Sequence, residues 1–285
     1  MITWQELLKQ GIDKLSSANI DDAEFDATQL ALKLFGKSRS EFIASKSDYV
    51  GEETVIRYHD FIIQRINRVP LQYILGEWDF YESTFCVGEG VLIPRSETEE
   101  LVDICVDIIN RNNYTVVYDL CSGSGCIGLS IAKKLPAVRC FLFELYDTPV
   151  EYIKKNKELL SIDNAEIIRC DILNPEMYEI PNADLIVSNP PYIQSGEIDS
   201  LQLEVQMEPI TALDGGNDGL LFYRAIADKW LKNLASGGSV ALECGEDQPP
   251  VVIDLFDKFN IKQMYVDLYG TERFVIAEDY LKGDL

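Results

Sequence analysis

Across residues 1–69, apolar side chains recur at the three- and four-residue spacing of amphipathic helices. Thr3 and Glu6 have the spacing of a capping box, in which each side chain bonds the backbone N–H of the other residue at a helix start. Gly36 follows the second periodic stretch and suits a helix C-cap. The pattern predicts a small helical domain. Its periodic stretches are 4–15, 22–35 and 52–66.

The pattern changes over residues 70–95, where aromatic and β-branched side chains become dense. Glycines at Gly76, Gly88 and Gly90, together with Pro94, interrupt the segment and provide turn positions. Strand-forming runs bounded by such residues are typical of a hairpin. We therefore expect a β-hairpin linker between the helical domain and the remainder of the chain.

From residue 96 to residue 285, strand-like and helix-like stretches alternate, which predicts an α/β domain with a mostly parallel, doubly wound sheet. Two consecutive strands at the end imply one antiparallel hairpin within that sheet. The predicted strands are 115–120, 138–144, 165–169, 184–188, 239–244, 261–268 and 274–277, and the predicted helices are 97–110, 127–135, 148–160, 220–234 and 251–259.

The charge and composition of the chain exclude some classes of binding partner. The 285 residues hold 25 Lys+Arg against 48 Asp+Glu, a formal net charge of -23. Proteins that grip a phosphate backbone usually carry a basic patch, so we expect no direct contact with nucleic acid. The apolar runs are shorter than the roughly 18 residues of a membrane span. The start, MITWQELLKQ, lacks the features of a leader. We expect a cytoplasmic monomer that does not enter a membrane.

Cysteine and histidine exclude further classes of site. Seven cysteines, without a CxxC pair, suit reduced and mostly buried thiols better than a disulfide framework or a zinc site. His59 is the only histidine, which argues against a multi-histidine metal site and against a Ser-His-Asp triad. We therefore expect no metal in the site.

A glycine-rich loop, CSGSGCIG, follows the predicted strand 115–120 directly. Gly123, Gly125 and Gly128 form G-x-G-x-x-G between a strand and a helix, where backbone N–H groups can approach a ligand closely. The motif alone suits NAD, FAD or S-adenosylmethionine, and a tight turn without a ligand is the alternative.

Acidic residues near this loop sharpen the interpretation. Asp119 precedes the loop, with a helix cap or a turn as its alternative role. Glu144 ends the next strand, where an acidic side chain can accept both hydroxyls of a ribose. Asp171, or the backbone of Ile172 beside it, is placed to meet an adenine edge, and an ordinary N-cap is the alternative.

A second loop, Asn189-Pro190-Pro191-Tyr192, follows the strand 184–188. The carboxyl ends of parallel strands share one edge, so this loop and the glycine loop should face the same crevice. Proline removes N–H donors, which leaves carbonyl oxygens as acceptors. These acceptors, the Asn189 amide and the Tyr192 ring suit a planar NH2 group and orient its nitrogen toward an electrophile. Glu204 and Glu208, at helical spacing farther along, are hypothesised to cover the substrate entrance.

With these motifs, the sequence resembles the class I S-adenosylmethionine-dependent methyltransferases. Within that class it resembles the peptide chain release factor N5-glutamine methyltransferases over most of its length. The segments that carry the resemblance are RVPLQYILGEWDFY, GVLIPRSETEELV, DLCSGSGCIGLSIA, SNPPYI, ALDGGNDGL with YRAI, LECGEDQ and DLYGTERFV.

The resemblance implies a seven-stranded Rossmann-like sheet, preceded by a helical substrate-recognition domain and a β-hairpin linker. It implies methyl transfer from S-adenosyl-L-methionine to the side-chain amide nitrogen of the glutamine in the Gly-Gly-Gln motif of class 1 release factors. Asn189, Pro190, Pro191 and Tyr192 would hold the glutamine amide, and Arg95 with 97–99 would lie near the cofactor pocket. The residues that would hold the cofactor are Cys121, Ser122, Gly123, Ser124, Gly125 and Glu144, joined by Asp119, Asp171, Ile172 and Asn189.

Three positions depart from the usual family pattern. Cys121 replaces a glycine, and because it carries a Cβ its backbone is expected to avoid positive φ. Glu144 replaces an aspartate, which moves the carboxylate outward by one methylene, and Ser96 replaces a proline. These departures concern cofactor affinity rather than the type of reaction.

Other functions remain open from the sequence. A ribosomal protein glutamine or a nucleic-acid base amine would suit the same Asn189 loop, although the acidic balance disfavours nucleic acid. A non-catalytic module that keeps the fold and an NAD dehydrogenase are further alternatives. The intact reactive positions argue against the former, and the absence of a hydride-transfer His or Lys near the loop argues against the latter.

Overall fold

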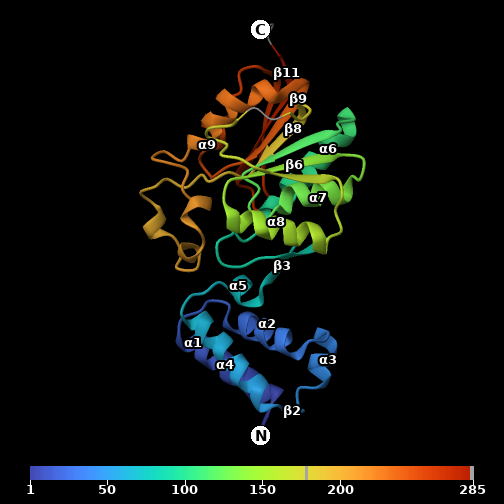
Figure 1. Ribbon diagram of the computed structural model, residues 1–285. Coiled ribbons are helices and arrows are strands. Elements are labelled where there is room, and N and C mark those ends of the chain that lie inside the picture. The colour runs from blue at the N-terminus through green and yellow to red at the C-terminus, as the bar shows by residue number, and fades with distance from the viewer. Residues whose placement is uncertain (177–178, 283–285) are drawn as a thin grey trace. The chain divides into compact units, whose positions relative to one another are not determined.

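The computed structural model describes residues 1–176 and 179–282, which fold into two compact units (Figure 1). Unit 1 contains Met1–Glu77 together with the short segment Gln202–Met207, and unit 2 contains the remaining described residues. The predicted division into a helical substrate-recognition domain up to residue 69, a linker and a catalytic domain stays a prediction. The sequence did not predict that 202–207 joins unit 1. No helix in the described ranges is both long and apolar enough to cross a lipid bilayer.

Unit 1 is built from helices whose ends carry the expected signals. Thr3 Oγ1 accepts a hydrogen bond from Glu6 N at 3.3 Å and Glu6 Oε2 accepts one from Thr3 N at 2.9 Å, which confirms the capping box. Gly36 ends the second helix in the left-handed region, also as expected. The elements are β1 (Ile2–Thr3), α1 (Trp4–Ser17), α2 (Ala23–Phe35), α3 (Arg39–Ala44), β2 (Tyr49–Val50), α4 (Glu52–Ile66) and α5 (Leu71–Leu75).

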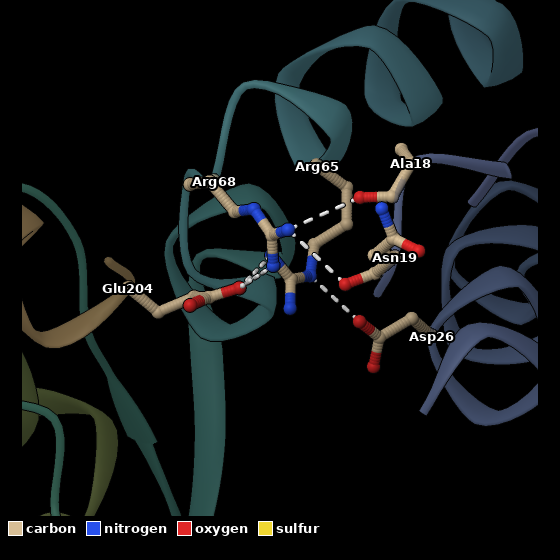
Figure 2. A network of polar contacts seen from close by, with 6 residues as sticks. All are labelled: Ala18, Asn19, Asp26, Arg65, Arg68 and Glu204. Atoms are coloured by element: carbon tan, nitrogen blue, oxygen red, sulfur yellow. Dashed lines mark hydrogen bonds and ion pairs between the residues drawn. The ribbon is translucent and has the colours of Figure 1, made fainter. Parts of the chain in front are cut away.

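A polar network holds the segment Gln202–Met207 within unit 1 (Figure 2). Arg65 of α4 donates from Nε to Asp26 Oδ2 at 2.6 Å and from Nη1 to Glu204 Oε1 at 2.9 Å. Arg68 donates to the same Glu204 oxygen at 3.1 Å and to the carbonyl oxygens of Ala18 and Asn19. One carboxylate from a distant part of the sequence is thereby held by two arginines.

Glu204 and Glu208 do not share a helix face. A 3₁₀ turn, η2 (Val205–Met207), lies between them, and Glu208 belongs to unit 2. The Glu208 carboxylate is buried, accepts a hydrogen bond from Ile93 N at 2.9 Å and pairs with Arg95. The single helix that the four-residue spacing implied is therefore wrong, and Glu208 is a buried structural partner of Arg95.

The described part of unit 2 contains a seven-stranded sheet with the order β10-β11-β9-β8-β5-β6-β7. Neighbouring strands from β9 to β7 run parallel, and β11 is antiparallel to both β9 and β10. The predicted mixed sheet with one terminal hairpin is confirmed. The strands are β5 (Val116–Leu120), β6 (Arg139–Glu144), β7 (Ala165–Arg169), β8 (Ala183–Ser188), β9 (Leu234–Glu243), β10 (Phe259–Val266) and β11 (Glu272–Tyr280).

Helices cover both faces of this sheet. Alternate strand residues point to opposite faces, so neighbouring residues pack with different helices. Val117 packs with one hydrophobic cluster and Tyr118 with the other. The first cluster includes residues from α6 (Glu97–Asn112), α7 (Cys126–Lys134) and α8 (Asp147–Leu159). The second includes residues from α9 (Leu221–Ala225), the π-helical turn η4 (Ile226–Trp230) and α10 (Pro249–Ile253).

A short hairpin precedes α6, as the sequence predicted. It pairs β3 (Glu77–Phe80) with β4 (Ser83–Cys86), and Tyr81 and Glu82 form the turn between them. Both turn residues have positive φ, 44° and 58°, as a two-residue type I′ hairpin turn requires.

Several element boundaries differ from expectation, among them both strands of the terminal hairpin, which begin two residues earlier than predicted. The helix predicted over 220–234 is divided into α9, η4 and the 3₁₀ turn η5 (Leu231–Asn233). Strand β9 begins earlier than predicted, at Leu234, and α10 ends at Ile253 rather than at residue 259. Apolar periodicity does not distinguish an α-helix from successive tighter and wider turns that bury the same face.

Candidate active site

The carboxyl ends of β5, β6, β8 and β9 meet at one edge of the sheet and place the candidate site there. The registers pair Leu120 with Phe143 and with Ser188, and Ser188 with Leu242. The loops that begin one residue beyond these pairs are therefore neighbours. They include both motifs singled out in the sequence, the glycine loop after β5 and the Asn189 loop after β8.

The glycine loop turns tightly between β5 and α7. Gly123 and Gly125 have φ values of 55° and 79°, in the left-handed region that favours glycine. Ser122 is buried, and its N–H donates to Phe143 O at 3.1 Å while its hydroxyl donates to Asp119 O at 2.7 Å. A Cβ added to Gly123 would meet open space, so the backbone of this residue borders a cavity.

The expectation that Cys121 avoids positive φ is wrong. Its φ is 58°, in the left-handed region. The turn that leads from β5 into the glycine loop imposes this conformation, which is unfavourable for a residue with a Cβ. Burial raises the pKa of the Cys121 thiol well above its ordinary value, with contributions from the Glu144 and Asp119 carboxylates. The thiol is therefore neutral at pH 7.

The cavity beside the loop collects residues from most of the predicted site. The predicted residues that line it are Cys121, Gly123, Glu144, Asp171, Ile172, Asn189 and Pro191. Apolar side chains add to its walls, including Leu92, Phe143, Pro209 and Phe222. Within the described chain, the predicted residues outside its lining are Asp119, Ser122, Ser124, Gly125, Pro190 and Tyr192.

Glu144 lies at the end of β6 with its carboxylate held by backbone N–H groups. Its Oε1 accepts from Leu145 N at 2.8 Å and Tyr146 N at 3.1 Å, and its Oε2 accepts from Gly123 N at 2.9 Å. A carboxylate has about four acceptor positions, so these donors leave about one, on Oε2. Burial raises the pKa of Glu144, against the three donors, which lower it. The remaining position on Oε2 is available to a ligand hydroxyl, and the expectation that Glu144 accepts both hydroxyls of a ribose stays a prediction.

Asp119 is fully buried behind the loop. Its Oδ2 accepts from Gly128 N at 2.9 Å, in the first turn of α7. Burial raises the pKa of Asp119 to about 7, although the bond to Gly128 lowers it. This placement matches the alternative stated for Asp119, a residue that holds the start of a helix.

Asp171 and Ile172 follow β7 and line the cavity. Asp171 Oδ1 accepts from Leu173 N at 2.9 Å, and its Oδ2 accepts from the Asn174 amide at 2.9 Å. The carboxylate thus organises its own turn. Ile172 is buried, and its carbonyl accepts from Trp230 Nε1 at 2.9 Å.

The Asn189 loop is fixed tightly in place. Pro190 and Pro191 are buried, and the carbonyl of Tyr192 accepts from Gln248 Nε2 at 2.9 Å. A Cβ on Gly215 would lie 2.7 Å from Tyr192 Cα, so only glycine fits against this backbone. Burial raises the pKa of Tyr192 to about 12, so its hydroxyl is neutral at pH 7.

The amide of Asn189 itself is partly buried and has a defined partner. Its Nδ2 donates to Thr98 Oγ1 at 3.2 Å. Thr98, in the first turn of α6, donates in turn to Glu243 Oε2 at 2.7 Å. Asn189 therefore places a polar side chain on the wall of the cavity, and its hydrogen bond to Thr98 restrains that side chain.

Family models and relatives match this arrangement. The PrmC N-terminal domain model matches residues 6–76, and the methyltransferase small domain model matches residues 99–208. The release factor glutamine methyltransferase of Clostridium botulinum is 36% identical over 282 residues, covering 97% of this chain and 99% of that protein. The Aquifex aeolicus protein of the same name is 33% identical, covering 95% of each chain. This chain belongs to the release factor glutamine methyltransferase family.

Solved structures show how widely the fold of this methyltransferase is shared. The hMettl16 catalytic domain, in complex with hairpin 6 of the MAT2A 3'UTR, has a TM-score of 0.54 at 14% identity, covering 82% of this chain and 84% of that one. The T. thermophilus 16S rRNA N2 G1207 methyltransferase RsmC, in complex with AdoMet and guanosine, has a TM-score of 0.50 at 17% identity, covering 71% and 49%. At these identities the likeness concerns the fold alone, and the predicted Rossmann-like class is confirmed.

Two residues of the methyltransferase site escaped the sequence interpretation. Thr98 and Glu243 form the polar chain behind Asn189, and both are buried. Thr98 lies within the IPRSETE segment, of which Arg95 and 97–99 were placed only near the cofactor pocket. The signal for Glu243 in the sequence was a carboxylate near the end of the predicted, mostly apolar strand 239–244.

Proposed function

We propose that this methyltransferase transfers a methyl group from S-adenosyl-L-methionine to the side-chain amide nitrogen, N5, of a glutamine. We further propose that this glutamine belongs to the Gly-Gly-Gln motif of a class 1 peptide chain release factor. The observation that carries the reaction type is the restrained Asn189 amide on the wall of the same cavity as Gly123 and Glu144. The family relationship supports the protein substrate.

The cavity residues suit the cofactor. Gly123 borders it with no side chain in the way, and Glu144 keeps about one free acceptor position for a ribose hydroxyl. Apolar walls from Phe143 and Ile172 suit a flat adenine ring. We assign the cavity-lining residues to contact with the cofactor, namely Cys121, Gly123, Glu144, Asp171, Ile172 and Asn189. We assign Asp119, Ser122, Ser124 and Gly125 to support of the loop.

When bound, S-adenosyl-L-methionine supplies an electrophilic methyl group, so that an N–C bond forms as an S–C bond breaks and S-adenosyl-L-homocysteine is left. The chain positions the nucleophile. An amide nitrogen is a weak nucleophile because its lone pair is delocalised. We assign Asn189 Oδ1 and the Pro190 carbonyl to accept its two N–H groups, which turns the lone pair toward the methyl group.

Positioning is the main contribution of these residues. Pro191 and Tyr192 complete the amide site, with the Tyr192 ring as a flat wall. No strong base is needed before attack, because the nitrogen becomes acidic as the methyl group arrives and its proton then leaves to water.

The net charge of -23 favours a protein substrate over a nucleic acid. An acidic enzyme attracts a basic partner surface and steers its approach in a salt-dependent way. A negatively charged phosphate backbone would be repelled by the same field. We therefore place base-amine methylation behind glutamine methylation.

The decisive experiment incubates the chain with purified class 1 release factor and methyl-labelled cofactor, followed by mass spectrometry of the Gly-Gly-Gln peptide. The expected result is one methyl group on the glutamine, lost in Asn189→Ala. Asn182→Ala is the matched control, because Asn182 is exposed just before β8, and it should retain activity. Label in a ribosomal protein or in rRNA, with none in release factor, would overturn the proposal.

A further inference from the structure

Behind Asn189 lies a chain of three polar side chains from three different elements. Asn189 follows β8, Thr98 is in the first turn of α6, and Glu243 ends β9. Asn189 Nδ2 and Thr98 Oγ1 are 3.2 Å apart, and Thr98 Oγ1 and Glu243 Oε2 are 2.7 Å apart. Thr98 is 2% exposed and Glu243 1%, so water cannot readily replace the bond between these two residues.

The chemistry of these groups sets the direction of both bonds. A hydroxyl carries one proton, and an ionised carboxylate only accepts. While Glu243 is ionised, above its pKa of about 7, the Thr98 hydroxyl therefore donates its proton to Glu243 Oε2, and Thr98 offers Asn189 only lone pairs. Asn189 therefore donates from its NH2 group to the Thr98 oxygen. This leaves Asn189 Oδ1 available to accept a hydrogen bond from the substrate.

We propose that Thr98 and Glu243 are positioning residues that fix the orientation of the Asn189 amide, so that Oδ1 is presented to the substrate NH2 group. This inference rests on the proposed function, because the substrate amide is its purpose. If the Asn189 amide were reversed, two NH2 groups would face each other as donors, with no acceptor between them. One hydroxyl proton thus decides whether Asn189 can hold the substrate.

A purely structural role would require only that the buried groups be satisfied. The two roles differ in which measurement changes. A structural bond affects stability and cofactor affinity, whereas a positioning bond affects the turnover of the amide substrate. The hairpin offers a matched control, since Thr84 Oγ1 donates to Asp79 Oδ1 at the same 2.7 Å on an exposed surface.

The kinetic test compares Thr98→Val, Thr98→Ser and Thr84→Val in release factor methylation. Thr98→Val should lower kcat/KM for release factor roughly 10- to 100-fold, mainly through kcat, because the amide is misoriented. Titration calorimetry should show cofactor affinity within about 2-fold of wild type, and Thr98→Ser should restore most of the rate because it keeps the hydroxyl. Thr84→Val should behave as wild type.

Three results of these measurements would overturn the inference. They are an unchanged kcat/KM in Thr98→Val, a loss in Thr98→Ser as large as that in Thr98→Val, and a fall in cofactor affinity that accounts for the whole effect. Thermal unfolding of each variant shows that the fold is retained. Glu243→Gln provides a second variant, because a neutral amide no longer commits the Thr98 proton to one direction.

A second measurement needs no substrate. In the chain labelled with ¹⁵N-asparagine, Asn189→Asp identifies the side-chain NH2 signal of Asn189. Thr98→Val should shift that signal upfield and speed its exchange with water, while Thr98→Ser should not. Identical signals in wild type and Thr98→Val would refute the orientation. A wild-type chain that leaves release factor unmethylated would instead contradict the proposed function, so the two failures can be told apart.

Discussion

The carboxylate of Asp119 holds the backbone N–H of Gly128 at 2.9 Å and so ties the end of β5 to the first turn of α7. Gly128 permits this approach, since a Cβ there would lie 2.8 Å from Asp119 Oδ2 and 2.9 Å from Leu142 Cγ. The other oxygen, Oδ1, has no hydrogen-bond partner among the described residues. The loop between these two residues is the proposed cofactor loop, so their bond sets its span.

Asp119 should make the protein less stable as pH rises. Burial raises its pKa to about 7, above the value of about 3.9 in an unfolded chain. Between these values the folded state binds the extra proton, so the free energy of unfolding falls as pH rises from about 4 to about 7. In Asp119→Asn this slope should be smaller, as measured by urea unfolding across that range. A slope equal to that of wild type would refute the assignment.

Cys121→Gly should stabilise the fold. Cys121 has a φ of 58°, which glycine adopts without strain, so the free energy of unfolding should rise by roughly 0.5–1 kcal/mol. Cys126→Gly is the control, because Cys126 begins α7 with ordinary helical geometry. That variant should lose about 1 kcal/mol or more. Chemical denaturation of both variants measures the difference, and a loss in both would show that Cys121 packing outweighs its strain.

The ion pair between Arg65 and Asp26 should dominate the stability of unit 1. Both side chains are buried, so Arg65→Met leaves an unpaired buried carboxylate and should cost about 3 kcal/mol. Burial already raises the pKa of Asp26 despite Arg65, so protonation should lessen the loss at low pH. Hydrogen exchange of the backbone amides of α2 and α4 measures this loss of stability. Glu204→Gln, at a partly exposed position, should cost about 1 kcal/mol or less, and equal losses would contradict this ranking.

The rate of methylation should fall as Glu243 becomes protonated. Burial raises the pKa of Glu243 to about 7, and protonated Glu243 can donate to Thr98 and release the Thr98 proton toward Asn189. Wild-type kcat/KM should therefore decrease from about pH 8 to about pH 6, whereas Glu243→Gln should be slow and without this inflection. The same inflection in Glu243→Gln would assign it to another group.

The charged and titratable groups around Glu243 limit which other group could cause an inflection in kcat/KM near pH 7. Arg273 and Arg95 lower the pKa of Glu243, and Glu97 raises it. The remaining titratable neighbours are Tyr192, Tyr223, Cys126 and Cys244. Burial raises the pKa of each of these four above its ordinary value, so they stay neutral near pH 7.

Local signals in the sequence predicted much of the fold and the walls of the site. The Thr3 capping box, the glycines after β5 and the prolines after β8 each act within a few residues of chain. The switch-point rule then placed Gly123 and Asn189 at one sheet edge, and both line the same cavity. Such features are readable because their cause is local backbone geometry.

The rest depends on contacts between distant residues. Thr98 and Glu243 are separated by 145 positions, and nothing in the local pattern of either predicts the bond. The positive φ of Cys121 arises from the turn into which it is built, and overrides the preference of its side chain. The pairing of Glu204 with Arg65 likewise joins segments 139 positions apart.

That last pairing has a consequence for how the chain is made. Unit 1 includes Gln202–Met207, so its helices leave the ribosome well before the segment that completes their polar network. At roughly 5–20 residues per second, the delay for the intervening stretch of about 125 residues is on the order of 6–25 s. During that time Arg65 has Asp26 but not Glu204. The nascent helical unit therefore lacks the Gln202–Met207 segment while most of the parallel strands of the catalytic sheet are synthesised.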